Sequence, residues 1–445
     1  MGRSRERPTL VEVEKFVVQN FGCRASQADG AAIEAALSLR GMARAESHHA
    51  ADWVILNTCT VTSNADEDVR HTVRRVNREN PDAKILVTGC YAQRAPDEIA
   101  QMPGVKLVVG NSHKTEIAAL VKPEQPLIQI EAPSYHAQIH VGDIFARHDF
   151  LASPVEDAAG DRSRPNLKIQ DGCNNRCSFC IIPFVRGRSR SMPVAEVVEQ
   201  VRALAANYPE VVLSGINLGR WGREPGFTMR LADLVRLILA ETDIERIRLS
   251  SVEPMDWSDD LLDLVATSPR IAKHVHAPLQ SGSDTVLRRM HRKYRPRHYE
   301  DRIRRARTLM PDAAIGADVM VGFPGESDEE FEQSRQFIES LPFTYLHVFT
   351  YSERPGTPAA ESRDIIPIPV RKERNRILRD LAARKHGEFL QSMIGRDLAA
   401  VTLDGDRSAL TENFLKVRLA APQEPRKSIQ IKAIGVEKDY LIAGN

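Results

Sequence analysis

Three cysteines stand close together near the middle of the chain, and their type and spacing are those of a metal site. Cys173, Cys177 and Cys180 form a C-x3-C-x2-C array. Thiolates bind zinc, copper(I) or iron–sulfur clusters. A zinc site, or a cubane held only by protein, takes four protein ligands, whereas this loop offers three. The array therefore predicts a cluster with one open metal position; the alternatives are buried structural cysteines or a zinc knuckle completed from elsewhere in the chain.

Three further cysteines lie in the first quarter of the chain, and each comes directly after a predicted strand. Apolar patterning predicts strands at 15–22, 52–57, 84–89 and 105–109, with helices at 28–38, 66–77 and near Pro96 between them. This βαβα order predicts a parallel sheet, which binds ligands at the carboxyl ends of its strands. We expect Cys23, Cys59 and Cys90 to meet at that edge as a second three-cysteine site, unless they are small apolar core residues.

The composition bounds the class of protein. A chain of 445 residues is too long for one core and predicts two to three domains. Its formal net charge of +1 gives no bulk attraction to nucleic acid, so any RNA contact depends on local patches. With no signal-peptide pattern and no apolar run of about 18 residues, we expect a cytoplasmic protein without membrane contact. In that reducing compartment the six cysteines are expected to be metal ligands or catalytic groups rather than disulfides.

The cysteine segments resemble those of a known family. The loop GCNNRCSFCIIPFVRGRSR is similar to the radical S-adenosylmethionine (SAM) superfamily, and GCRAS, NTCTVTSNAD and TGCYAQRAP are similar to the methylthiotransferases within it. The runs NTCTVT, GCYAQ, VVLSGINLG and RIRLSSVEP most resemble the branch that acts on threonylcarbamoyladenosine in tRNA. Ser26 departs from the family pattern, which usually has Asn there, and this puts a hydrogen bond beside Cys23 in question.

The resemblance implies two [4Fe-4S] clusters and SAM as cofactors. Cys173, Cys177 and Cys180 would hold the cluster that binds and cleaves SAM. Cys23, Cys59 and Cys90 would hold an auxiliary cluster that delivers sulfur, with a second SAM as the methyl donor. The implied reaction is 2-methylthiolation of the modified adenosine beside the anticodon. The implied partners are the tRNA anticodon stem-loop and a low-potential electron donor such as flavodoxin or ferredoxin.

The expected fold is α/β and has three folded parts. Residues 1–125 are expected to form a doubly wound parallel-sheet domain, 126–160 a linker, 161–390 a radical SAM domain, and 391–445 a small β-barrel similar to the TRAM module. Six βα units predict a partial (β/α)6 barrel for the radical SAM domain. Its strands are expected at 166–170, 210–214, 246–250, 274–279, 314–321 and 345–350.

Polar turns at the ends of these strands are the expected cofactor site, because parallel strands bind ligands there. The resemblance implies that they line SAM. They contain Ser214, Gly215, Asn217, Glu253, Gln280 and Asp318. For Glu253 a surface salt bridge is an equal alternative. Arg354, which follows the sixth strand, is expected in the same pocket.

Clustered basic residues are expected to bind the substrate. Arg186 and Arg188 follow the cysteine loop and suit a carboxylate or a phosphate. Arg292 and Lys293 lie in the segment 288–307, which contains ten Lys or Arg residues. Solvated surface charge is the alternative for both groups. Isopentenyladenosine tRNA and a ribosomal-protein aspartate are the rival substrates, and a zinc-dependent RNA-binding protein is the rival without catalysis.

Overall fold

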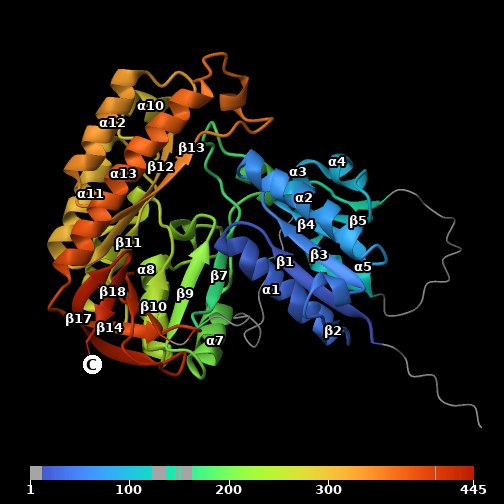
Figure 1. Ribbon diagram of the computed structural model, residues 1–445, viewed down its shortest axis with the longest axis horizontal. Coiled ribbons are helices and arrows are strands. Elements are labelled where there is room, and N and C mark those ends of the chain that lie inside the picture. The colour runs from blue at the N-terminus through green and yellow to red at the C-terminus, as the bar shows by residue number, and fades with distance from the viewer. Residues whose placement is uncertain (1–12, 123–136, 147–149, 152–162, 406, 445) are drawn as a thin grey trace, which may run out of the picture.

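Three β structures follow one another along the chain (Figure 1). The computed structural model describes residues 13–122, 137–146, 150–151, 163–405 and 407–444. The N-terminal sheet lies at the right of Figure 1, the central barrel lies to its left, and a small C-terminal barrel lies below the long helices of the centre. The expected α/β architecture is confirmed.

The N-terminal sheet has six strands in the order β2-β1-β3-β4-β5-β6, and every neighbouring pair is parallel. The strands are β1 (Lys15–Asn20), β2 (Ala43–Arg44), β3 (Trp53–Thr58), β4 (Lys84–Gly89), β5 (Val105–Gly110) and β6 (Gln138–His140). All six residues of β3 are buried, as in a parallel strand covered on both faces. Because β1, β3 and β4 are adjacent, the residues that follow them share one edge.

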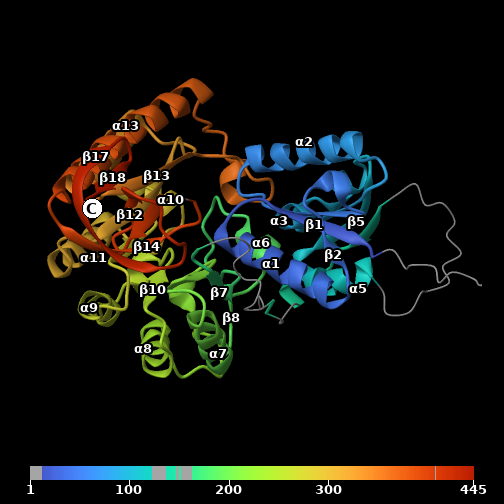
Figure 2. The same ribbon diagram turned by 60° about the horizontal axis from the view of Figure 1, so that its bottom comes forward.

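Helices cover both faces of this sheet (Figure 2). They are α1 (Arg24–Leu39), η1 (His48–Ala50), α2 (Ser63–Glu79), α3 (Cys90–Arg94), α4 (Pro96–Ala100), η2 (Asn111–Glu116) and α5 (Ile117–Val121). α2, α3 and α4 pack against one face, which includes Val54 and Val87, while α1 and α5 pack against the other, which includes Ile55 and Leu86. α1 begins four residues before the expected 28–38 helix, because Cys23 already occupies its N-cap position.

Strand β6 falls within the segment 126–160, which the sequence predicts to be a linker. It pairs in parallel with β5 and extends the sheet by one strand. Three residues are too short a run to show a period in the sequence, which explains why the pattern did not reveal it. Residues 126–136, 147–149 and 152–160 of this segment lie outside the described residues.

Six parallel strands of the central part curve into a partial barrel. They are β7 (Asn166–Asp171), β9 (Glu210–Gly215), β10 (Arg246–Leu249), β11 (His274–His276), β12 (Ala314–Val321) and β13 (Tyr345–Thr350). The groups β10-β9-β7 and β11-β12-β13 meet at a bridge between Ile247 and Ile271. β8 (Arg190–Ser191) runs antiparallel beside β7, and no strand of the described chain lies beyond β13. The barrel is therefore open between these two rims.

Helices pack around the strands of the barrel. They are α6 (Ile182–Arg186), α7 (Val194–Ala205), α8 (Leu231–Glu241), α9 (Asp259–Thr267), α10 (Asp284–Arg289), α11 (Pro296–Leu309), α12 (Asp328–Ser340) and α13 (Ile368–Ser392). Strand β11 is shorter than the expected 274–279, because Pro278 lacks an N–H and Gln280 has a φ of +66°. No helix in the described ranges has the length and apolar character that crossing a membrane requires.

The C-terminal barrel is closed and follows α13 directly. Its strands are β14 (Asp397–Thr402), β15 (Ser408–Thr411), β16 (Lys416–Arg418), β17 (Ser428–Glu437) and β18 (Tyr440–Ala443), in the order β14-β15-β16-β18-β17. It docks on the amino-terminal end of the central strands. Arg248 of β10 donates to the carbonyl oxygens of Thr411 and Glu412 at 3.0 Å each, and Phe414 stacks on His274 with 4.5 Å between ring centroids.

The N-terminal domain contacts both rims of the open barrel. At the β7 rim, Asn166 Nδ2 donates to the Arg24 carbonyl at 2.8 Å. At the β13 rim, the N–H of Ser63 donates to Ser352 Oγ at 3.0 Å, and Arg354 pairs with Asp66 at 2.7 Å. Arg354 was expected in the SAM pocket, but it is 4% exposed and is engaged in this interdomain ion pair. The N-terminal domain thus lies across the gap in the barrel.

Candidate active site

The loop with Cys173, Cys177 and Cys180 is fixed by the backbone at its start and in its middle. Gly172 has a φ of +70°, and a Cβ at this position would lie 2.0 Å from the Arg188 carbonyl oxygen, so only glycine fits the turn into Cys173. The N–H of Cys173 then donates to the Gly187 carbonyl at 3.1 Å. Further along, Ser178 donates through its N–H to Met290 and through its hydroxyl to Arg289. The loop is therefore held from both sides.

Donors surround the sulfur atoms of this loop. Cys173 Sγ accepts from the Asn175 N–H at 3.4 Å and from Asn217 Nδ2 at 3.7 Å, and Cys177 Sγ accepts from Arg292 Nη1 at 3.3 Å. Such donors favour thiolates. Burial, followed by the neighbouring Cys177, raises the pKa of the Cys180 thiol to about 12 in the metal-free protein. A metal must displace this proton when it binds.

The second set of cysteines also comes together, at the carboxyl edge of the N-terminal sheet. Burial, and then the nearby Cys90 and Cys23, raises the pKa of the Cys59 thiol to about 12, which places the three thiols within electrostatic reach of one another. Gly22, with a φ of +100°, leaves room for Cys59, because a Cβ there would lie 2.9 Å from the Cys59 sulfur. Ser26 Oγ lies 3.7 Å from Cys23 Sγ, so the departure from the family pattern still leaves a polar contact.

The spacing of the sulfur atoms tests whether either set suits a single ion. Three thiolates on one tetrahedral zinc ion stand about 3.8 Å apart, given Zn–S bonds of about 2.3 Å. No three cysteine sulfurs of the described chain lie within 4.8 Å of one another. A cubane spreads its ligated irons over separate corners, so its thiolates stand further apart. In the described chain, neither triad therefore stands at the spacing that one tetrahedral ion requires.

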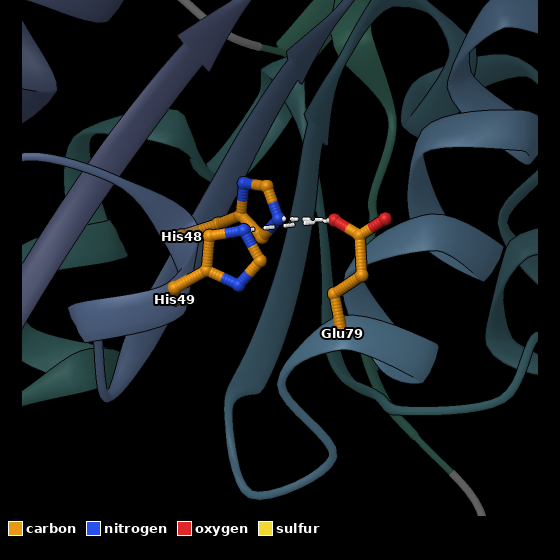
Figure 3. A group of neighbouring side chains, drawn as sticks. All are labelled: His48, His49 and Glu79. Carbon is orange, nitrogen blue, oxygen red and sulfur yellow. Dashed lines mark hydrogen bonds and ion pairs between the residues drawn. The ribbon is translucent and has the colours of Figure 1, made fainter.

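Imidazoles and a carboxylate gather in two places of the described chain: His48 with His49 and Glu79, and His276 with Asp318 and His347. Figure 3 shows the first group, in which both rings reach one carboxylate. His48 Nε2 lies 2.8 Å and His49 Nε2 3.8 Å from the same Glu79 oxygen. His48 and His49 precede β3 and Glu79 precedes β4, so the group lies at the amino-terminal end of the sheet, away from the cysteines. It is a hydrogen-bonded group at the surface.

Helix α6 connects the two cysteine sites. It begins directly after Cys180 and Ile181, and its five residues span about 8 Å. Cys90 packs with Ile181 and Val185, and Asn111 Nδ2 donates to Cys90 Sγ at 3.6 Å and to the Val185 carbonyl at 2.7 Å. The C-terminal residue of α6, Arg186, lies close enough to influence all of the second triad electrostatically. The two sites thus face each other across one turn of helix.

A buried ion network fixes this contact between the domains. Asp29 of α1 pairs with Lys114 at 3.0 Å, with Arg186 at 3.0 Å, and with Lys168 of β7. Burial alone would raise the pKa of Asp29, but the charges of Lys114, Lys168 and Arg186 outweigh it and hold this pKa well below its usual range. Asp171 provides a second carboxylate for Lys168 and Arg186, at 3.2 and 2.9 Å.

Arg186 was expected to bind substrate, but in the structure it lies in the contact between the domains. Its side chain is 2% exposed, and its guanidinium forms ion pairs with both Asp29 and Asp171. Arg292 is 8% exposed, donates to Glu253 at 2.5 Å and contacts the Cys177 sulfur, and it lines the cavity beside the loop, so its role toward substrate stays a prediction. Glu253 forms a partly buried salt bridge with Arg292. Arg188 and Lys293 are exposed and stay candidates for substrate contact.

Of the residues expected around SAM, Asn217 and Glu253 lie beside the cysteine loop. Asn217 is the most informative: its Nδ2 faces Cys173 Sγ, its N–H donates to Gln170 at 2.6 Å, and its Oδ1 is buried without a partner in the described structure. An orphaned oxygen beside the open loop fits a ligand that donates hydrogen bonds, as the amino group of SAM does. Ser214 and Gly215 precede it on β9, where a Cβ on Gly215 would lie 2.8 Å from the Gln170 Cβ.

A cavity of about 170 Å³ opens beside the loop and is lined by Asn175, Cys177, Glu253, Arg292 and Lys293, among others. Gln280 follows β11 and Asp318 lies on β12, and the N–H groups of Leu279 and Gln280 donate to the Asp318 carbonyl at 3.0 and 2.8 Å. The Asp318 carboxylate contacts two imidazoles, with His276 Nε2 at 3.1 Å and His347 Nδ1 at 3.2 Å. The role of these side chains toward SAM remains a prediction.

Sequence reasoning missed Asp29, Lys114, Lys168 and His347. Lys168 left a signal, since it is a charged residue inside the strand Asn166–Asp171, whose six positions are all buried. A buried lysine needs a carboxylate nearby. The identity of that carboxylate had no signal, because Asp29 lies 139 residues earlier in the chain.

Comparison with known proteins decides the family. Residues 15–110 match the Uncharacterized protein family UPF0004, and residues 167–338 match the Radical SAM superfamily. The threonylcarbamoyladenosine tRNA methylthiotransferase MtaB of Aquifex aeolicus (strain VF5) is 36% identical over 418 residues, which are 94% of this chain and 99% of that protein. The chain belongs to the radical SAM methylthiotransferase family. It is therefore a transferase, and the family implies SAM and a [4Fe-4S] cluster, for which the open loop of Cys173, Cys177 and Cys180 is suited.

Other relatives of this methylthiotransferase carry two different names. MtaB of Bacillus subtilis (strain 168) is 36% identical over 415 residues, covering 89% of this chain and 88% of that protein. The tRNA-2-methylthio-N(6)-dimethylallyladenosine synthase of Endomicrobium trichonymphae is 32% identical over 410 residues, covering 90% and 92%. Among solved structures, the radical SAM methyltransferase TsrM of Kitasatospora setae has a TM-score of 0.56 at 15% identity, covering 78% of this chain and 74% of that one, which supports the fold alone.

Proposed function

We propose that this enzyme converts N6-threonylcarbamoyladenosine beside the tRNA anticodon to its 2-methylthio derivative, with a [4Fe-4S] cluster at each cysteine triad and two SAM molecules. The observation that carries the proposal is the meeting of two three-cysteine sites across α6. One site adjoins a cavity, and the other is packed against the same helix. A sulfur donor and a radical site must be close for one adenosine carbon to use both.

The bound groups would supply radical chemistry, which an unactivated aromatic C–H bond requires because acid–base catalysis cannot open it near neutral pH. The protein's own residues hold the site. Asn217 and Arg292 donate to the Cys173 and Cys177 sulfurs, and Glu253 fixes Arg292. Asn217 Oδ1 is the acceptor available to the SAM amino group. The N-terminal domain, lying across the open side of the barrel, limits the access of water.

The substrate assignment rests on the relatives. The four relatives named for threonylcarbamoyladenosine are 31–36% identical and include the two at 36%, and the four named for dimethylallyladenosine are 32–34% identical. The tRNA anticodon stem-loop would approach the exposed Arg188 and Lys293, and a flavodoxin or ferredoxin would supply electrons. A ribosomal-protein aspartate is a weaker candidate, because none of these eight relatives is named for it.

Nucleoside analysis tests the proposal. Anaerobically purified enzyme with SAM and a reductant is given tRNA bearing either threonylcarbamoyladenosine or isopentenyladenosine, and digested nucleosides are separated by mass spectrometry. We expect 2-methylthio product from the first tRNA alone. Equal turnover of both tRNAs would contradict the substrate assignment. Iron analysis of the same protein is expected to give about eight irons per chain. A protein that contains zinc and no acid-labile sulfide would contradict the proposal that it has iron–sulfur clusters.

A further inference from the structure

A polar group lies inside the barrel and is not used by the chemistry described so far. It consists of His276 on β11, Asp318 on β12 and His347 on β13, three neighbouring strands. His276 Nε2 lies 3.1 Å from one Asp318 oxygen, and His347 Nδ1 lies 3.2 Å from the other. We call these three residues the His–Asp–His group.

The proton arrangement of the group follows from its contacts. Burial alone would raise the pKa of Asp318, but the hydrogen bonds from His276 and His347 outweigh it and hold this pKa well below its usual range. An ionised carboxylate only accepts hydrogen bonds, so both ring nitrogens that face it must donate. The other nitrogen of His276 bonds Tyr345 Oη at 2.8 Å. Nε2 of His347 is therefore the one ring nitrogen of the group without a protein partner in the described structure.

The group is reachable from the open side of the barrel. The side chain of His347 is 53% exposed and that of Asp318 is 25% exposed, whereas that of His276 is 8% exposed. β13 is the rim strand, and alternate residues of a strand share a face, so Tyr345, His347 and Phe349 point the same way. Leu346 and Val348 on the other face pack toward the core. A ligand in the barrel would meet His347 and Phe349 first.

The group lies deeper in the barrel than the strand ends, although Asp318 was itself expected among the residues that line SAM. Asp318 and His347 are each followed by three more strand residues, which places them about 10 Å from the carboxyl ends of β12 and β13. The protein backbone links the group to the cysteine loop. The Val252 N–H donates to the His276 carbonyl at 3.1 Å, and the next residue, Glu253, is the partner of Arg292 beside Cys177. A ligand that touches the group would thus extend from the cluster loop into the barrel.

The barrel supports the group from underneath. Tyr345 Oη bonds His274 Nε2 at 2.7 Å as well as His276, and Phe414 of the C-terminal barrel stacks on His274. These contacts hold the ring of His276 and, through Asp318, orient His347. The binding group is therefore preorganised, which lowers the cost of ordering it around a ligand.

We propose that the His–Asp–His group binds the threonylcarbamoyl chain of the substrate adenosine and thereby selects it over an isopentenyl chain. This inference rests on the proposed function. The chain carries a carboxylate, a urea-like linkage and a hydroxyl. Asp318 and Nε2 of His347, whose ring donates through Nδ1 to Asp318, are acceptors for the urea N–H groups and the hydroxyl of the chain. An isopentenyl chain would bury these groups without partners, which a site of this kind rejects strongly.

The test replaces the exposed histidine by a ring of similar size that cannot hydrogen-bond. His347→Phe is compared with the unaltered holoenzyme by kcat/KM on tRNA bearing threonylcarbamoyladenosine and on tRNA bearing isopentenyladenosine. We expect the preference for the first tRNA to fall at least about 10-fold. His347→Gln, which keeps a hydrogen-bonding group at this position, should retain most of the preference. His71→Phe on α2, the same change at another exposed histidine, is the matched control and should alter nothing.

The outcomes separate this inference from the proposed function. If the unaltered enzyme does not modify threonylcarbamoyladenosine, the proposed function fails first. If it does and His347→Phe keeps the full preference, the inference alone is overturned. Iron content checks that the variant is folded. If the iron content of His347→Phe is low, the smaller change His347→Ala is measured in its place, and a full preference in that variant overturns the inference. If the unaltered holoenzyme binds zinc and His347→Phe does not, the group is a metal site, and this result would also overturn the inference.

Discussion

The two cysteine triads are built in opposite ways. Cys173, Cys177 and Cys180 lie within eight residues of one another in a single loop, so their proximity is local. Cys23, Cys59 and Cys90 come from the ends of β1, β3 and β4, and only the parallel sheet brings them together. A local triad depends on its loop. A triad assembled by topology depends on the packing of a whole domain and of whatever lies against it.

The surroundings of the two triads also differ. The loop triad borders a cavity and is touched by the Arg292–Glu253 pair. The strand triad contains two buried cysteines and lies beside Arg186, which the network around Asp29 holds in place. This difference predicts that the loop triad tolerates changes in the N-terminal domain, whereas the strand triad is sensitive to the interface between the domains.

The largest effect is expected from removing one ligand of each triad. Cys177→Ser should lose about half the iron and all reductive cleavage of SAM, because the open cluster has no other protein ligands. Cys59→Ser should also lose about half the iron but should still cleave SAM. Iron analysis and detection of 5′-deoxyadenosine measure the two results. Cleavage of SAM by the Cys177 variant would show that the loop triad is not the SAM site.

The next effect concerns the interface. Asp29→Asn leaves Lys114, Lys168 and Arg186 with one buried carboxylate fewer, and breaking a buried ion pair in this way costs about 3–5 kcal/mol. We expect a lower midpoint of thermal unfolding under anaerobic conditions and loss of iron from the strand triad first. Glu373→Gln, which removes an exposed partner of Arg376, is the control and should not change the midpoint. Equal iron loss from both triads would contradict the expectation that the strand triad depends more on the domain interface.

Sequence patterns predicted what is local. The strands β1, β3, β4, β7 and β12 appear close to their expected positions, because each contains an apolar run or an apolar alternation bounded by a turn. The approach of Cys23, Cys59 and Cys90 was also predictable, since parallel strands end at one edge. The expected sheet topology therefore predicted the strand triad, which the spacing of these cysteines in the sequence would not have indicated.

Partners distant in the sequence were not predictable. Arg186 reads as a free charge next to the cysteine loop, but its partner Asp29 lies 157 residues earlier. The basic segment 288–307 is similar: Arg302 and Arg305 pair with Asp259 of α9, and Arg289 pairs with Glu330 of α12. Counting charges along the chain overestimates a patch when the neutralising residues come from other helices.

A smaller effect separates individual thiols within the triads. In chelator-treated protein, the pKa values of Cys59 and Cys180 are raised from 9.0 to about 12, which leaves about 1000-fold less thiolate at pH 8. Higher intrinsic nucleophilicity at higher pKa recovers part of this, so alkylation should be about 30- to 60-fold slower than for an ordinary thiol. The rate should rise with pH toward 12. Mass spectrometry of iodoacetamide-labelled peptides measures it, with urea-unfolded protein as the reference.

The smallest effect tests which triad faces the RNA. Lys293 is exposed at the rim of the cavity beside the loop triad, and Arg74 is exposed on α2 of the N-terminal domain. If the anticodon stem-loop enters at the loop triad, Lys293→Gln should weaken tRNA binding by a few-fold and reduce the slope of log Kd against log salt by about 0.7–0.9, the counterion release of one phosphate contact. Arg74→Gln should change neither quantity. A matching loss from both variants would mean that tRNA spans the two triads, and a loss from Arg74→Gln alone would place the RNA over the strand triad.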